Sequence, residues 1–232
     1  MNTKKLCLIV VAALVAAVAA PIYATATPIS ATITLSQVFA GYTPDGPSPW
    51  LTATFTSTST TAGTLTLTSN LSDADFLQGL ESANAALGWG FYLNSSLSAV
   101  TCTSTDCATS ALFGGSYNDG PVPGVFNLAF GWGSGSSNRF VAGSSNTYAL
   151  TFASALLGNP FVPNTHGWSS VAHVQGIGPN GTCSGWIVSG SGTTSGSLTP
   201  CVQPPGVPEP ATLGLLGLGL AGLGFARRAR KS

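Results

Sequence analysis

The residues that could carry out acid–base chemistry in the middle of this chain are few and widely spaced. Its two histidines, His166 and His173, belong to no H-E-x-x-H arrangement. Residues 131–135 place a serine one position too late for the G-x-S-x-G turn of hydrolases. Serines are abundant, but abundance alone does not define a Ser-His-Asp triad. We therefore expect both histidines to be structural or surface residues.

The acidic residues offer two other kinds of site, and each lacks what its chemistry needs. Asp73 and Asp75 could form the carboxylate pair of a glycosidase, but they are also explained as acids in the first turn of a helix. The turn at residues 118–120 (Asn-Asp-Gly) offers oxygen ligands to calcium without the density of a D-x-D-x-D loop. We predict no catalytic residue, no cofactor and no metal site, and we expect the chain not to be an enzyme.

Tryptophans are the remaining candidates for binding. Tryptophan on an exposed sheet can stack on sugar rings, and Trp89, Trp132 and Trp168 are the candidates for such a role. Packing in the protein core is the alternative, since large aromatic side chains contribute most of the buried area of a sandwich.

The charge distribution excludes one class of partner. Residues 27–199 contain six acidic residues, one basic residue, Arg139, and no lysine. Binding to nucleic acid needs a basic surface that neutralises several phosphates. One arginine cannot form such a surface, so we expect no nucleic-acid partner.

The N-terminus has the pattern of a secretory signal peptide. Lys4 and Lys5 precede an apolar run to about Ala20, and small residues follow. We predict a signal peptide at residues 1–26, cleaved at the A-x-A site 24–26 and directing the rest of the chain across a membrane. Cleavage after Ala24 and an uncleaved anchor are the alternatives.

An exported domain can form disulfides. Four cysteines follow the signal peptide, an even number that predicts two disulfides. The pairing between sequence neighbours is preferred among three connectivities, and the spacing of the cysteines fits zinc poorly. The two predicted pairs are Cys102–Cys107 and Cys183–Cys201.

Short stretches in which threonine or serine alternates with apolar residues dominate residues 27–199. The clearest are 30–39, 50–57 and 64–69, and such alternation predicts half-buried strands. About nine strands separated by Gly/Pro/Asn turns predict an all-β antiparallel sandwich of jelly-roll type. One exception is 72–86, where a capping serine and acids predict a short helix.

The C-terminus is organised differently. A proline-rich spacer at 200–210 precedes an uncharged apolar stretch at 211–226 and a basic end at 227–232. As a helix the apolar stretch is about 24 Å long, and the bilayer core is about 30 Å thick. We predict a short transmembrane helix with a cytoplasmic C-terminus, because positive residues favour the cytoplasmic side. The basic residues are Arg227, Arg228, Arg230 and Lys231.

Together these three parts resemble the PEP-CTERM sorting signal of Gram-negative bacteria. The motif residues are Val207, Pro208, Glu209 and Pro210, followed by the apolar stretch and the terminal arginines. The resemblance implies recognition by exosortase after export by the secretion machinery. It also implies a transient single-pass stay in the inner membrane and a final location at the cell surface or in an exopolysaccharide or biofilm matrix.

A second segment, His173-Val174-Gln175, is similar to one found near the end of many PEP-CTERM ectodomains, without any assigned chemistry. We therefore expect an exported, non-enzymatic surface or matrix protein that contacts extracellular polysaccharide. The alternative is a carbohydrate-binding or polysaccharide-modifying jelly-roll protein.

Overall fold

The computed structural model describes residues 27–72, 74–77, 79, 88–133, 135–192 and 196, together with 217, 218 and 220. Strands and two short 3-10 helices make up the regular structure of the described domain. The strands are β1 Ser30–Leu35, β2 Gln37–Gly41, β3 Leu51–Ser57, β4 Ala62–Ser69, β5 Phe76–Leu77, β6 Trp89–Phe91, β7 Leu97–Cys102, β8 Ser110–Asp119, β9 Val122–Gly131, β10 Phe140–Val141, β11 Ser145–Phe152, β12 Trp168–Ile177 and β13 Cys183–Gly190, and the 3-10 helices are η1 Ser136–Asn138 and η2 Pro179–Gly181.

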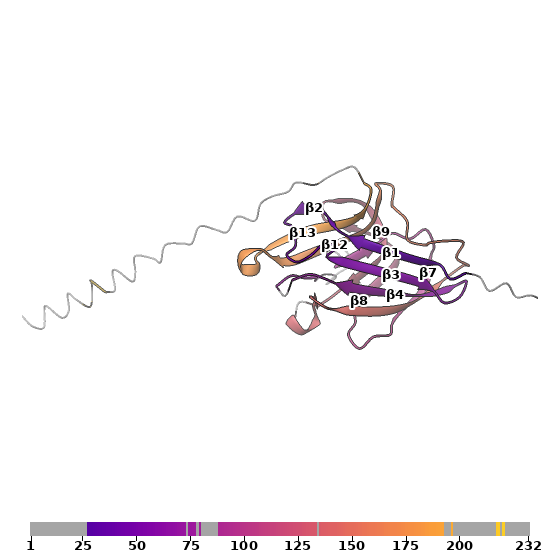
Figure 1. Ribbon diagram of the computed structural model, residues 1–232, viewed down its shortest axis with the longest axis horizontal. Coiled ribbons are helices and arrows are strands. Elements are labelled where there is room, and N and C mark those ends of the chain that lie inside the picture. The colour runs from indigo at the N-terminus through magenta and orange to yellow at the C-terminus, as the bar shows by residue number, and fades with distance from the viewer. Residues whose placement is uncertain are drawn as a thin grey trace, which may run out of the picture.

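The strands form two antiparallel sheets. The first has five strands in the order β1-β3-β4-β11-β7, and β1, β3 and β4 lie side by side in Figure 1. The second has eight strands, with β12 pairing to β13, β5 and β6, and β13 continuing to β2. The all-β antiparallel class predicted from the alternating pattern is therefore confirmed.

One apolar core lies between the two sheets. Alternate residues of each strand point into it, as in β3, where Leu51, Ala53 and Phe55 are fully buried. Rings from opposite sheets meet there: Phe130 of β9 and Tyr148 of β11 have centroids 4.4 Å apart. This shared core gives the sheets a sandwich-like arrangement.

A smaller apolar cluster lies on the other face of the eight-stranded sheet. Along β12, Ala172 and Val174 belong to the main core, whereas Val171 belongs to this second cluster. Phe39 packs edge-on against Trp168 there, with ring centroids 5.7 Å apart. The second sheet is thus apolar on both faces, which explains why its strands alternate less clearly than those of the first.

The sequence-based element boundaries need three corrections. The predicted strand 30–39 is two strands, because the chain leaves the first sheet after β1 and enters the second as β2. The glycine-rich strand β8 was missed. The helix predicted at 72–86 is wrong at Phe76–Leu77, which form strand β5 instead, and residues 80–87 lie outside the described part.

Among the described residues, no helix has the length and apolar character that crossing a bilayer requires. The predicted signal peptide and most of the predicted transmembrane segment lie outside the described residues.

Candidate functional site

Little of the sorting tail falls within the described structure. The motif residues Val207, Pro208, Glu209 and Pro210 and the basic end lie outside it. Residues 217, 218 and 220 are helical, and Leu218 and Leu220 are 72% and 63% exposed. Those two leucines belong to the stretch predicted to enter a membrane.

The three tryptophans considered for stacking on sugars are core residues instead. Trp89 and Trp168 are 0% exposed and Trp132 is 2% exposed. Trp89 stacks on Phe91 with centroids 5.3 Å apart and donates a hydrogen bond to Ser170. Rings buried in this way have no free face for a sugar, so the core-packing alternative describes them.

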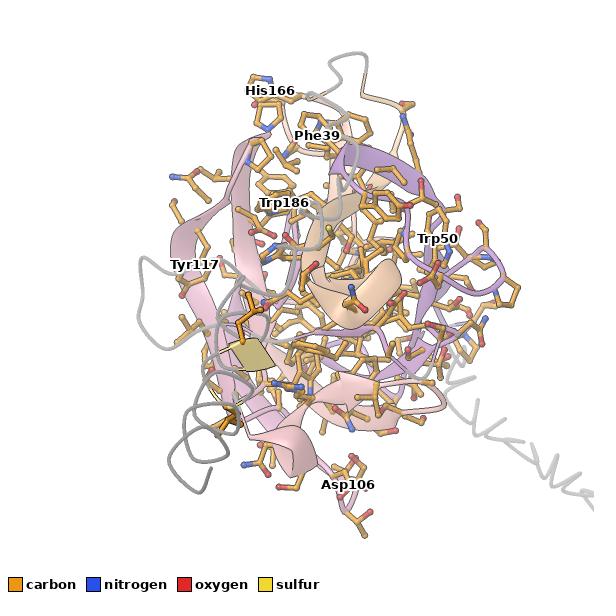
Figure 2. All side chains as sticks on the ribbon, turned by 90° about the vertical axis from the view of Figure 1, so that its left-hand side faces the viewer. Phe39, Trp50, Asp106, Tyr117, His166 and Trp186 are labelled. Carbon is orange, nitrogen blue, oxygen red and sulfur yellow. A yellow bond between two sulfur atoms is a disulfide. The ribbon has the colours of Figure 1, made fainter. Side chains whose placement is uncertain are left out.

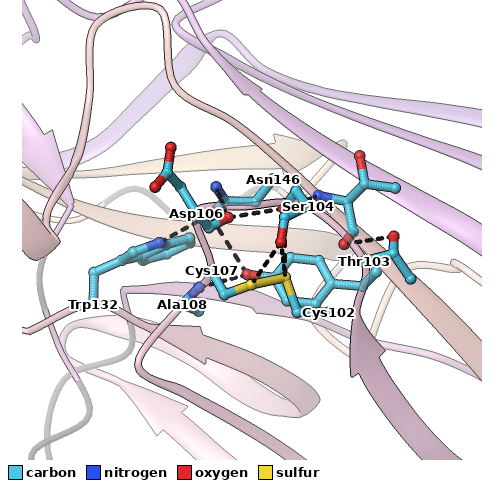
Figure 3. The surroundings of a disulfide bond; sticks show 10 residues. Cys102, Thr103, Ser104, Asp106, Cys107, Ala108, Trp132 and Asn146 are labelled. Atoms are coloured by element: carbon cyan, nitrogen blue, oxygen red, sulfur yellow. Dashed lines mark hydrogen bonds between the residues drawn. A yellow bond between two sulfur atoms is a disulfide. The ribbon is translucent and has the colours of Figure 1, made fainter.

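The predicted disulfide between Cys102 and Cys107 is confirmed. It closes a loop at the end of β7, and Figure 3 shows the hydrogen bonds around it. Within that loop the hydroxyl of Ser104 donates to the carbonyl of Asp106 at 2.8 Å. Cys183 is also disulfide-bonded, but Cys201, the other member of its predicted pair, lies outside the described residues.

The buried side chain of Asn146, on β11, joins the disulfide loop to the first sheet. The carbonyl of Asn146 accepts hydrogen bonds from Trp132 Nε1 at 3.0 Å and from the hydroxyl of Tyr148 at 3.5 Å, and its amide donates to Asp106. The hydroxyl of Tyr148 accepts in turn from the amide of Ala108. Burial raises the pKa of Tyr148 to about 12. The hydrogen bond from Ala108 to its hydroxyl ties the disulfide loop to the sheet.

His173, in the segment similar to other PEP-CTERM ectodomains, stacks on Trp186. The two rings are nearly parallel, with centroids 4.2 Å apart, and both nitrogens of His173 are buried without a hydrogen-bond partner. Burial lowers the pKa of His173 to about 4, so the ring is neutral at neutral pH. Trp186 also donates to the Asp119 carboxylate at 3.3 Å. These contacts give all three side chains a structural role.

Asp75 is the second buried titratable group. Its side chain is 0% exposed, and its Oδ2 accepts a hydrogen bond from the amide of Asp45 at 2.7 Å. Burial, together with the nearby charge of Asp45, raises the pKa of Asp75 to about 6. Asp73 lies outside the described residues, so the glycosidase pair has no geometry to consider. Within the described part, no three His, Cys, Asp or Glu side chains come together as metal ligands.

A pocket of about 400 Å³ lies beside the disulfide loop. One wall is formed by residues 105–107, and the other runs from Ser137 to Val141. Figure 2 shows Asp106 at one end of the molecule and His166 at the other, and neither histidine is among the residues that line this pocket. The full lining is Thr105, Asp106, Cys107, Trp132, Ser137, Asn138, Arg139, Phe140, Val141, Ser144, Ser145 and Asn146.

Arg139 is the charged donor of this pocket. Its guanidinium carbon lies 3.9 Å from the centre of the Phe76 ring. Phe76 is held there because β5 pairs with β10, directly after Arg139. The Nε of Arg139 is buried without a hydrogen-bond partner. In the sequence, Arg139 served only as evidence against binding to nucleic acid. It is the one basic residue of residues 27–199, and this was the signal that could have marked it as a functional residue.

The pocket combines one cation with hydroxyl and amide groups and can therefore bind a small anionic, hydroxyl-rich molecule. It holds no histidine, and its one carboxylate, Asp106, is on an exposed residue. This composition suits binding better than proton transfer.

Comparison with known proteins adds one family match, which lies in the tail. Residues 206–231 match the PEP-CTERM protein-sorting motif. No curated protein and no solved structure matches the chain. The sequence-based resemblance is thus confirmed: this chain carries the PEP-CTERM protein-sorting motif, the C-terminal sorting signal of exosortase substrates.

Proposed function

We propose that this chain is a non-enzymatic surface or extracellular-matrix protein that exosortase releases from the membrane by processing its tail. The observation that carries the proposal is the sorting motif at residues 206–231, placed directly after a β-rich domain. Gram-negative origin, a biofilm or exopolysaccharide setting, and the jelly-roll class of the sandwich belong to the same proposal.

The surface of the first sheet supports a structural role. Its five strands contain no charged residue. Threonines pair across them in register, as in the row of Thr32, Thr54, Thr66 and Thr147. Thr66 and Thr147 share a hydrogen bond between their hydroxyls at 3.4 Å. Such a face is polar without charge and suits contact with a hydrated polymer.

The titratable residues first considered for catalysis support the non-enzymatic part. Asp75 accepts a backbone hydrogen bond, and His173 stacks on Trp186 with a pKa of about 4. A general base is most effective with a pKa near the working pH. His173 is therefore poorly suited to that task at neutral pH.

Intact mass of the protein isolated from its host tests the processing. We expect a mature chain that ends near Pro208–Pro210 and is recovered outside the inner membrane. A matched variant, Glu209→Ala, should accumulate unprocessed in the membrane, while Gln203→Ala in the spacer should be processed normally. A chain from the host that still ends at Ser232 would refute the proposal.

A second measurement tests the absence of catalysis. The purified protein is incubated with the extracellular polysaccharide of its host, and polymer length is followed by size-exclusion chromatography. We expect no change in length or composition. Shortening that disappears on heat denaturation would favour the polysaccharide-modifying alternative.

A further inference from the structure

The pocket beside the disulfide contains a cation, Arg139, that forms no ion pair in the described structure. Arg139 is the one basic residue between positions 6 and 226. Within the described part of the chain it takes part in no ion pair, and its guanidinium carbon lies over the Phe76 ring. Because Nε is buried, the N–H groups that a ligand can reach are those of the two terminal nitrogens.

The rest of the pocket limits what that ligand can be. Thr105, Ser137, Asn138, Ser144 and Ser145 surround the arginine with hydroxyl and amide groups. These groups donate and accept hydrogen bonds without carrying charge, as the hydroxyls of a sugar require. A volume of about 400 Å³ admits one or two rings of a longer saccharide.

We propose that this pocket binds an acidic sugar, with Arg139 paired to its carboxylate and the surrounding hydroxyl and amide groups bonded to its ring hydroxyls. A guanidinium matches a carboxylate with two parallel N–H···O bonds. The inference deepens the proposed matrix function and rests on it, since the extracellular location would bring the pocket to matrix polysaccharide.

The position of the pocket walls favours a preformed site. The disulfide fixes residues 102 and 107, and Asn146 holds the carbonyl of Asp106 from the sheet side. On the opposite wall, the amide of Val141 donates to the Ser144 hydroxyl at 3.0 Å. A wall held by such bonds loses little conformational entropy when a ligand binds.

The electrostatics predict modest, salt-dependent affinity. Asp106 lies on the wall facing Arg139, and the domain between the two apolar ends has more acids than bases. A negatively charged ligand therefore gains from one cation and is weakly repelled by the remainder. Added salt should weaken the binding, because the arginine–carboxylate attraction is screened more than the hydrogen bonds to hydroxyls.

Calorimetric titration of the full chain in detergent with a uronic acid trisaccharide tests the proposal. The comparison ligands are the neutral trisaccharide with the same linkages and inorganic phosphate. Arg139→Gln should weaken uronate binding about tenfold or more, because it removes a charge-assisted pair. Arg139→Lys should fall between, since lysine keeps the charge without the fork of donors.

An exposed pocket residue gives variants that leave the Arg139–Phe76 contact intact. Asn138→Glu should weaken binding and Asn138→Lys should preserve or strengthen it, because both place a charge on the wall beside Arg139. Thr165→Glu is the matched control. Thr165 is exposed next to His166, at the opposite end of the molecule from Asp106 (Figure 2), and this variant should bind as the unaltered protein does.

Three results would overturn the inference: equal binding of the neutral trisaccharide, phosphate binding as tight as that of the uronate, or unchanged affinity in Arg139→Gln and both Asn138 variants. These outcomes are separable from failure of the proposed function. A chain that is processed and exported but does not bind uronate contradicts only the pocket. A chain that binds uronate but is never released contradicts only the sorting.

Discussion

Replacing Asp75 by asparagine should make the protein lose stability in acid, because it removes one of two opposed titrations. Burial raises the pKa of Asp75 from 3.8 to about 6, so the folded protein holds more protons than the unfolded chain between these values. Asp75 therefore stabilises the fold increasingly as pH falls through that window. Burial lowers the pKa of His173 from 6.5 to about 4, so the unfolded chain holds more protons there and acid destabilises the fold.

The two effects are similar in size. Between pH 7 and pH 4, linkage gives at most about 2.5 kcal/mol gained through Asp75 and about 3 kcal/mol lost through His173. Solvent screening at the partly exposed His173 reduces its share, so about 1–2 kcal/mol each is the working expectation. In the unaltered protein the two effects should therefore nearly cancel, so this pair should change the free energy of unfolding little between pH 7 and pH 4. Asp75→Asn leaves the loss through His173 uncompensated.

His173→Phe is the matched opposite variant. Phenylalanine keeps a ring stacked on Trp186 and removes two buried nitrogens that lack partners, so it should stabilise the protein by about 1 kcal/mol at pH 7. It also removes the acid-induced loss, so this variant should gain stability as pH falls toward 4. The double variant should restore a flat profile.

Urea unfolding followed by tryptophan fluorescence at pH 7, 6, 5 and 4 measures the four free-energy profiles. The charges that face these groups in the described structure are Asp45 beside Asp75, and Asp119 across Trp186 from His173. Neither is altered by the substitutions. Profiles that stay parallel across the unaltered protein and both single variants would refute the opposed-titration argument.

Substitutions at the disulfide and at Trp89 test the pocket wall and the core packing. Removing the disulfide with Cys102→Ser and Cys107→Ser should lower the free energy of unfolding by about 2 kcal/mol, since the closed loop is short. An unchanged urea midpoint would contradict this, once thiol counting has verified that the disulfide is gone. Trp89→Ala should cost about 3–5 kcal/mol and Trp89→Phe clearly less, because phenylalanine keeps a ring against Phe91 and loses the second ring of the indole and the hydrogen bond to Ser170. Equal urea midpoints for these two variants would show that the ring contact adds nothing.

The first sheet was predictable because its outer face meets water. In β3 and β4, threonines alternate with leucine and phenylalanine, and the structure places the apolar residues inside. Pairing of β3 with β4 in register then follows from the short connection between them. Periodicity is reliable where one face is solvated, and this sheet is such a case.

The second sheet was harder to predict for a physical reason. Its strand β12 buries residues on both faces, so the period of two is lost from its hydrophobicity. Strand β8 contains Gly114 and Gly115, which resemble a turn in the sequence although they continue the strand past irregularities in its pairing. The acids at 73 and 75 suggested a helix start, but Asp75 instead bonds to the backbone of a distant loop.

The candidate pocket could not be predicted, because it joins segments about 35 residues apart. The Cys102–Cys107 pair was predicted from spacing alone, yet nothing in the spacing places that loop opposite Arg139. The one sign of the pocket in the sequence was a single arginine in a domain with few charged residues. Whether this arginine is paired with a carboxylate can be read only from the fold, which shows no ion pair for it among the described residues.

A structural role and a binding role for Arg139 predict different ratios of two measured effects. Its contact with Phe76 is a single cation–π pair near the surface, so Arg139→Gln should lower the free energy of unfolding by about 1 kcal/mol or less. The same substitution should weaken uronate binding about tenfold or more. If Arg139 only holds β5 and β10 together, stability falls and affinity for a ligand does not depend on residue 139 once the protein is folded.

Phe76→Leu separates the two roles further, because it removes the ring that orients the guanidinium but leaves the charge. Phe76→Leu should lose part of the affinity for uronate at the same salt concentration. If binding is unchanged in Phe76→Leu but lost in Arg139→Gln, the interaction depends on charge alone and not on the orientation of the guanidinium.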